Sequence, residues 1–306
     1  MLSSQSKAYL FALSAVLAWS TVSTAFKLSL RFLSPLGLLL FSSLAATLFL
    51  VGVNAYQKGT ALFSNFIPNL RSSLVSGLLN PCVYYLMLFV AYHRLRAQEA
   101  QVLNYTWAIV LSVMSIIILR ERFRIKDILA LAASFIGVII ISTRGKVLQL
   151  NFTDPFGSAL AVSTSLVWAA YWILNMRDPR PAEQKLMYNF MVGAALVACY
   201  ALIRAGMGEA PLFTQNLRIP AALWGALYVG IFEMGFTFIL WLRALSFSRN
   251  TASVANLIFI TPFISLLFIA LILRESIHPA TVVGLVIIVL SNLWEKWNRS
   301  APIQKN

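Results

Sequence analysis

Long apolar segments separated by short polar ones dominate this chain. Ten of them have close to the 20 residues that an α-helix needs to cross about 30 Å of hydrocarbon. The pattern therefore predicts an all-α membrane protein with ten transmembrane helices. The ten segments are residues 8–30, 35–53, 74–92, 97–119, 125–143, 156–176, 185–203, 221–243, 251–273 and 279–297.

Composition supports this interpretation. Hydrophobic residues make up 59% of the 306 residues, charged residues only 11%, and the mean hydropathy is +0.79. A soluble domain carries roughly 25% charged residues, so a water-soluble fold is excluded and the lipid bilayer is the expected environment. The first segment could alternatively be a signal peptide, because Lys7 precedes it and a small residue, Ala18, could end a cleavage site. We favour a helix, since the apolar run continues past Ala18.

The net charge of +14 comes from basic residues placed between the apolar segments. This placement argues against nucleic acid as a partner and indicates loops that lie near anionic headgroups. With both termini inside, fifteen Lys and Arg residues fall in cytoplasmic segments and nine outside. The bias predicts a multi-pass protein of the inner (plasma) membrane with cytoplasmic termini, and Trp294 and Trp297 beside Lys296 predict an interfacial anchor.

The two halves of the chain resemble each other. Leu-Arg-Glu follows a long apolar segment twice, ending at Glu121 and at Glu275, and Leu-x-Trp occurs at Trp19 and as Leu-Val-Trp at Trp168. At the same offset, small residues recur seven apart in the segment that follows each Leu-Arg-Glu, where they let helices approach closely. These small residues are Ala130, Gly137, Gly284 and Ser291.

Each repeat has an odd number of helices, five, so the second copy must enter the membrane from the opposite side. We therefore predict two inverted five-helix repeats, residues 1–146 and 147–306. Inverted repeats are typical of secondary transporters, because two pairings of similar halves give inward-open and outward-open states.

These features resemble the drug/metabolite transporter superfamily, specifically its ten-helix EamA-type exporters. The resemblance covers essentially the whole chain and rests on Trp19-Ser20, the Leu-Arg-Glu ends, the small residues and Thr261-Pro262. Residues 99–107 are similar to the aromatic amino-acid exporter branch, although Ala108 replaces the proline expected there, and Ser42-Ser43 replaces an arginine common in the family. The resemblance implies a helical bundle with a central cavity that exports small metabolites, such as amino acids, without ATP.

Glu233 is the principal candidate for binding substrate. A charge in the middle of a membrane helix costs about 2.5–3.5 kcal/mol on insertion scales, so it usually faces a cavity. Glu233 could bind a substrate ammonium or carry a coupling proton, or it could be a hydrogen-bonded structural carboxyl. Asn80, followed by Pro81, holds nearly the same place in 74–92 and either lines the cavity or marks a packing kink.

The remaining candidates are aromatic and polar residues on other segments. Glu99 could bind substrate or stabilise the start of its helix. Asn104 lies about 140° from Glu99 around the helix, so the two cannot face one cavity. Each aromatic candidate either lines the cavity or packs the bundle. The further candidate binding residues are Tyr105, Trp107, Trp19, Trp168 and Tyr171.

Enzymatic machinery is not visible in the sequence. Two cysteines, Cys82 and Cys199, and two histidines, His93 and His278, have no metal-ligand spacing, and no nucleotide-binding motif occurs. We therefore predict a transporter that is not an enzyme, with no metal and no cofactor, and a small molecule as partner. The alternative is a membrane-embedded enzyme or a scaffold. Substrate identity, direction, proton coupling and oligomeric state stay open.

Overall fold

The computed structural model is a bundle of helices. It describes residues 3–107, 110, 114, 125–147, 153–208, 212–214, 218–248, 254 and 256–300. In these ranges the β contacts reduce to one isolated bridge, between Leu33 and Phe213. The predicted all-α class is therefore confirmed.

The elements follow the order of the predicted spans. Residues 1–147 hold α1 (Ser4–Ser29), α2 (Pro35–Lys58), η1 (Gly59–Phe63), η2 (Ile67–Asn69), α3 (Leu70–Gly77), η3 (Leu78–Val83), α4 (Tyr84–Arg94), α5 (Ala97–Asn104) and α7 (Ile125–Ser142). The rest of the chain holds α8 (Pro155–Arg177), α9 (Ala182–Gly206), α10 (Ile219–Tyr228), η5 (Val229–Phe236), α11 (Thr237–Phe247), η6 (Asn256–Ile260), α13 (Thr261–Phe268), η7 (Ile269–Leu273) and α14 (Pro279–Ser300).

Six of the described helices are long and apolar enough to cross a membrane. They are Ser4–Ser29, Pro35–Gln57, Ile67–Arg94, Pro155–Asn175, Ala182–Gly206 and Ile219–Phe247. Shorter helices occupy the other four predicted spans, and the span 97–119 is described only at 97–107, 110 and 114. Glu121, one of the two repeated Leu-Arg-Glu ends, lies outside the described residues.

Apolar side chains face outward and many polar ones face inward. Leu48, Leu202 and Trp224 are each more than 70% exposed, whereas Asn80 and Asn189 are fully buried. This distribution suits a lipid environment, in which the outside of the protein is as apolar as the core. Some buried hydroxyls bond to the backbone of their own helix: the Ser42 hydroxyl, for example, donates to the Leu38 carbonyl at 2.6 Å, one turn earlier.

Local sequence sets where the helices begin. Side chains of Ser3, Ser34 and Asp154 accept hydrogen bonds from backbone N–H groups three residues later. Proline follows directly at Pro35 and Pro155, where its missing N–H costs no hydrogen bond.

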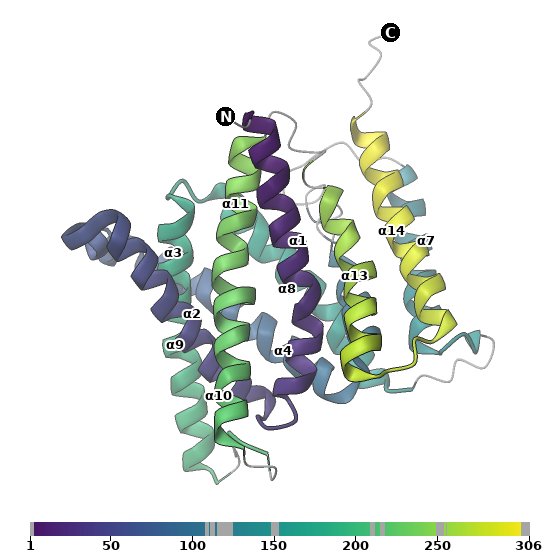
Figure 1. The fold of residues 1–306 in the computed structure, drawn as a ribbon, viewed down its shortest axis with the longest axis horizontal. Coiled ribbons are helices and arrows are strands. Elements are labelled where there is room, and N and C mark those ends of the chain that lie inside the picture. Colours follow the sequence, from purple (N-terminus) through teal and green to yellow (C-terminus); the bar gives the residue numbers. More distant parts are fainter. Residues whose placement is uncertain are drawn as a thin grey trace.

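Glycines mark the closest helix crossings. Helices α7 and α14 lie side by side (Figure 1), and a Cβ added at Gly137 would come within 2.9 Å of the Gly284 carbonyl oxygen. Two of the small residues singled out in the sequence therefore meet directly in the bundle. Small side chains allow this approach of one backbone to another.

Two long spans are interrupted by π-helical segments. In the first, α3–η3–α4, the backbone at Asn80 leaves helical geometry (φ −143°, ψ 117°), and Pro81 supplies no N–H to the helix. In the second, α10–η5–α11, the π-helical segment contains Glu233. Segment η3 packs against α9, and η5 packs against α2. The first turn of α1 and the last turn of α14 lie at the same end of the bundle (Figure 1).

Candidate functional site

A cavity of about 100 Å³ lies among helices from both ends of the chain. Side chains of α1, α4, α5, α8, η5 and α11 surround it. Its lining is Trp19, Val22, Ser23, Phe26, Tyr84, Leu88, Tyr92, Gln101, Asn104, Tyr105, Trp107, Trp168, Trp172, Glu233, Phe238, Trp241 and Ile258.

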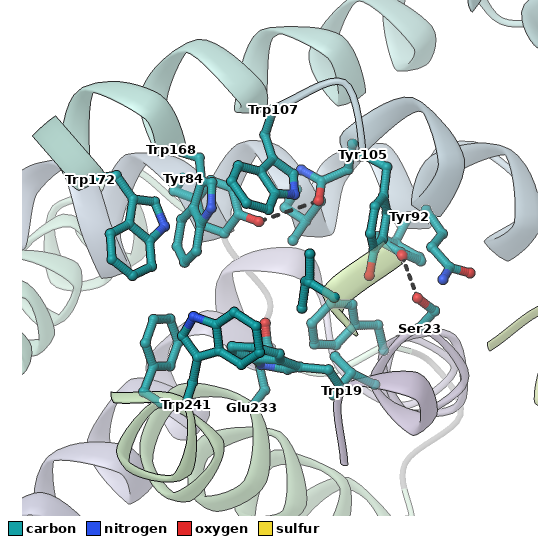
Figure 2. A pocket seen from close by; sticks show the side chains of 17 residues that line it. Trp19, Ser23, Tyr84, Tyr92, Tyr105, Trp107, Trp168, Trp172, Glu233 and Trp241 are labelled. Carbon is teal, nitrogen blue, oxygen red and sulfur yellow. Dashed lines mark hydrogen bonds between the residues drawn. The ribbon is translucent and has the colours of Figure 1, made fainter. Parts of the chain in front are cut away.

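Aromatic rings form two facing walls of this cavity (Figure 2). One wall carries Trp172, Trp168, Tyr84, Trp107 and Tyr105, and the other carries Trp19 and Trp241. The rings touch one another in edge and tilted contacts. Ring centroids lie 4.6 Å apart for Tyr84 and Trp168, and 5.6 Å apart for Trp19 and Trp241. Such contacts hold large side chains in fixed positions and give the cavity rigid walls.

Glu233 provides the carboxyl group of the cavity. It belongs to η5 and is only 9% exposed. Its Oε1 accepts a hydrogen bond from the Tyr85 hydroxyl at 3.0 Å, and the Trp19 side chain also lies close to the carboxylate, while its Oε2 makes no hydrogen bond of standard geometry among the described residues. A carboxyl oxygen left without a partner in a buried position is costly unless a ligand or water completes it.

Neutral polar groups complete the lining. The Asn104 side-chain amide donates to the Thr164 hydroxyl at 2.7 Å, and the Ser23 and Tyr92 hydroxyls bond each other at 2.7 Å. The Tyr84 hydroxyl donates to Asn104 Oδ1 at 3.5 Å. These contacts use the side-chain donors of Asn104 and Tyr84 within the protein, whereas the indole N–H of Trp172 is buried without a partner among the described residues.

Six of the predicted binding residues line the cavity together. They are Glu233, Asn104, Tyr105, Trp107, Trp19 and Trp168. Other members of the walls are not among the binding residues predicted from the sequence, although their helical spacing is regular. Trp19, Ser23 and Phe26 recur at i, i+4 and i+7 on α1, and Trp172 follows Trp168 by one turn of α8.

Asn80 and Tyr171 lie behind the wall, outside the lining. The Tyr171 hydroxyl lies among the side chains of Asn80, Asn175 and Asn189. The amide atoms of Asn80 and Asn189 are buried without a hydrogen-bond partner among the described residues. This polar cluster sits where η3 meets α9, next to the close contact between Gly193 and Pro81.

Glu99 also lies outside the lining. Its Oε1 accepts a hydrogen bond from Arg144 Nε at 2.8 Å in a partly buried ion pair. Glu99 is thus separated from the cavity that Asn104 lines, in agreement with the separation of about 140° expected between the two residues around the helix. Nearby, a Glu275 side-chain oxygen accepts a hydrogen bond from the Ala97 backbone N–H at 3.3 Å and caps the start of α5.

Charged groups at the helix ends tie neighbouring helices together. Asp154 accepts the Gly157 backbone N–H and pairs with Arg94 at 2.9 Å, and these contacts lower the pKa of Asp154. Burial opposes ionisation of Asp178, but hydrogen bonds from Arg180 outweigh it and lower the pKa of Asp178. Among the described residues no group of three or more His, Cys, Asp or Glu side chains could hold a metal ion.

Apolar, membrane-length helices around a cavity with aromatic walls and one carboxyl group are the architecture of a polytopic membrane transporter. The sequence model of the EamA-like transporter family matches residues 6–143 and again residues 155–294. The chain belongs to this family.

Several similar proteins from bacteria and archaea carry transporter names. An uncharacterized transporter from Archaeoglobus fulgidus is 24% identical over 93% of this chain and 95% of its own length. The uncharacterized transporter YoaV from Bacillus subtilis is 24% identical over 92% of this chain and 94% of its own length. Protein PecM from Dickeya dadantii is 26% identical over 70% and 69%. A solved crystal structure, 19% identical over 95% of this chain and 96% of its own, has the same fold at a TM-score of 0.63.

Proposed function

We propose that this protein is a secondary transporter of the inner membrane that exports small amphipathic metabolites by alternating access. The observation that carries the proposal is the cavity around Glu233. Its walls combine side chains from both segments that match the family, so movement of one segment against the other would change access to it.

The arrangement of the interrupted spans supports an inverted repeat. Segment η3 packs against α9 and η5 packs against α2, so each break touches the second long helix of the other half. This exchange is expected if residues 1–146 and 147–306 are related by a pseudo-two-fold axis in the membrane plane. Two similar pairings of such halves provide the inward-open and outward-open states.

The size of the cavity supports a mechanism with moving walls. About 100 Å³ is less than the roughly 150 Å³ of a cavity that holds benzene. A metabolite with a ring therefore fits only if the aromatic walls separate. Movement of α1 and α11 away from α4 and α8 would open this space, because these helices carry the two facing walls.

Flux through proteoliposomes tests the proposal. Purified protein is reconstituted into liposomes loaded with a panel of amino acids, amines and other small metabolites, and efflux is followed by mass spectrometry of the external medium. Empty liposomes are the control. Efflux of at least one metabolite above the empty liposomes is expected.

The alternative of a membrane enzyme or scaffold predicts a different result. An enzyme would convert a metabolite of the panel into a new product, which the same mass spectra detect. Neither efflux nor counterflow for any metabolite in the panel would contradict transport.

A further inference from the structure

We propose that the preferred substrate is a small organic monoamine without a carboxylate, bound by its ammonium group between Glu233 and the aromatic walls. This inference rests on the proposed transport function and names its substrate class. It separates two groups of metabolites that the sequence leaves together, the amino acids and the amines.

One carboxylate oxygen of Glu233 makes no hydrogen bond of standard geometry among the described residues. Oε1 is held by Tyr85, but Oε2 is buried without a partner among the described residues. Gln101 also lines the cavity, and its side-chain amide oxygen is likewise buried without a hydrogen-bond partner among the described residues. Of the three unpaired polar atoms in the described lining, these two oxygens are acceptors and the third, the Trp172 indole N–H, is a donor, so the matching ligand carries more N–H donors than acceptors. A primary ammonium has three.

Apart from tyrosine hydroxyls, the only ionisable side chain among the described lining residues is a carboxyl group. The seventeen lining residues include one carboxyl group and no Lys, Arg or His. A zwitterionic amino acid would bring its own carboxylate into this space without a cation to pair with. A buried charge without a partner is strongly unfavourable, whereas an ammonium beside Glu233 forms an ion pair.

Three basic groups near the ends of α1 and α4 belong to a different pocket. Lys27, Arg31 and His93 line a separate space together with Glu275. Phe26 and Tyr92, the chain neighbours of Lys27 and His93, line the cavity instead, with ring centroids 5.2 Å apart. None of the three basic residues belongs to the described lining beside Glu233.

The aromatic lining of the cavity also favours a cation. Rings attract a cation held within about 6 Å of their faces, most strongly when the site is desolvated, and tryptophan is the most effective. Five tryptophans line this cavity: Trp19, Trp107, Trp168, Trp172 and Trp241. The rings thus favour an ammonium group, and they also contact an apolar body attached to it. Because the cavity of about 100 Å³ is smaller than one that holds benzene, the body is expected to be no larger than about one ring, which enters when the walls separate.

Tryptophan fluorescence provides the test, because five of the eight tryptophans line the cavity. Phenethylamine and phenylalanine are a matched pair of probes that differ only in the carboxylate. Each is titrated at pH 7 into purified protein in detergent. We expect phenethylamine to bind with an affinity at least about tenfold higher than that of phenylalanine. Equal affinities, tighter binding of phenylalanine, or no binding of phenethylamine would overturn the inference.

Two variants locate the binding. Glu233→Gln removes the charge and is expected to lower the affinity for phenethylamine about tenfold or more. Glu183→Gln makes the same chemical change at the start of α9, outside the lining, and is expected to bind like the wild type. Melting temperatures of all three proteins establish that they are folded. If Glu233→Gln binds phenethylamine as tightly as the wild type, the ammonium is not held by Glu233.

The same liposome panel distinguishes this inference from the transport proposal. Efflux of amino acids in preference to amines would overturn the amine assignment and leave transport in place. Absence of all efflux would contradict transport itself.

Discussion

The two interrupted spans, α3–η3–α4 and α10–η5–α11, use similar backbone breaks for different purposes. In the first, Pro81 and the non-helical geometry of Asn80 accompany the break, and Asn80 packs among Tyr171 and Asn189. In the second, the π-helical break η5 contains no proline, and Glu233 faces the aromatic cavity. A broken membrane helix is therefore not sufficient to mark a binding site; the site lies where the break opens onto a cavity.

The surroundings of the two spans are similar in another respect. The end of α4 is joined to the start of α8 through Arg94 and Asp154, and the end of α11 is joined to the start of α1 through the Ser4 hydroxyl and the Phe247 carbonyl, at 2.7 Å. Helices α8 and α1 each carry one of the tryptophans related by the repeat. Each interrupted span is thus joined at its end to the start of a helix that carries one of these tryptophans.

Substitution of the glycines packed at the two breaks should have the largest effects, and these are on the stability of the fold. A Cβ added at Gly230 would lie 2.3 Å from the Ser42 carbonyl oxygen, and one added at Gly193 would lie 2.4 Å from Pro81 Cδ. We expect Gly230→Ala and Gly193→Ala each to destabilise the protein by about 2–3 kcal/mol through overpacking. Gly52→Ala is the matched control, since nothing lies within 4 Å of its added Cβ. Thermal unfolding in detergent measures all three; equal melting temperatures would contradict the close packing at the breaks.

The aromatic wall should show the next largest effect, on substrate binding. Trp168→Ala removes the ring that contacts Tyr84 and Phe238, and we expect about a tenfold loss of affinity, equivalent to about 1.4 kcal/mol. Trp224→Ala removes a tryptophan that is 72% exposed on the outer face and should leave affinity unchanged. Titration by fluorescence or calorimetry makes the comparison. A larger loss in Trp224→Ala than in Trp168→Ala would place the substrate outside the cavity.

Removing the Arg94–Asp154 contact between α4 and α8 should have a smaller effect, on stability, that depends on pH. Asp154→Ala removes a helix cap and is expected to cost about 1 kcal/mol at pH 7. Because the pKa of Asp154 is lowered in the folded protein, its contribution is present above the unfolded pKa of about 3.9 and is lost as the pH falls through the folded pKa.

Melting curves of wild type and Asp154→Ala should therefore converge on acidification below about pH 4. Asp154→Asn serves as a control, since an asparagine still caps the helix but does not titrate. A difference in stability that stays constant down to pH 2 would show that the carboxylate charge is not responsible.

Asn80 should show the smallest effect on binding. Its side chain lies outside the cavity lining, so Asn80→Ala is expected to change the affinity for substrate by less than about twofold, although the melting temperature can change in either direction. Glu233→Gln measured in the same way is the contrast. A loss of affinity as large in Asn80→Ala as in Glu233→Gln would mean that both breaks contribute to one site.

Much of the fold was predictable because membrane helices are constrained by length and polarity alone. The apolar segments locate the helices, and the carboxyl of Glu233 in mid-span indicates a cavity, since few other environments tolerate it. Trp19 and Trp168 were found through the repeat. These are properties of single segments, and they do not depend on how the segments pack.

Other parts of the site depend on partners that are distant in sequence. Glu99 is paired by Arg144, which comes from α7 and could not be assigned to it from the sequence. Tyr92, Trp172 and Trp241 complete the cavity, but aromatic residues at helical spacing are equally common in bundle packing. Asn80 matches Glu233 in position, and only the packing of η3 against α9 places it away from the cavity.

Transport by the wild type, Glu233→Gln and Glu183→Gln tests the central claim most directly. The three proteins are reconstituted at equal density, and counterflow of the metabolite with the highest flux is measured. Wild type and Glu183→Gln should transport equally, and Glu233→Gln should retain less than about a tenth of that rate, because it lacks the charge that holds the substrate. Equal transport by Glu233→Gln and the wild type would contradict the assignment of this cavity as the substrate site.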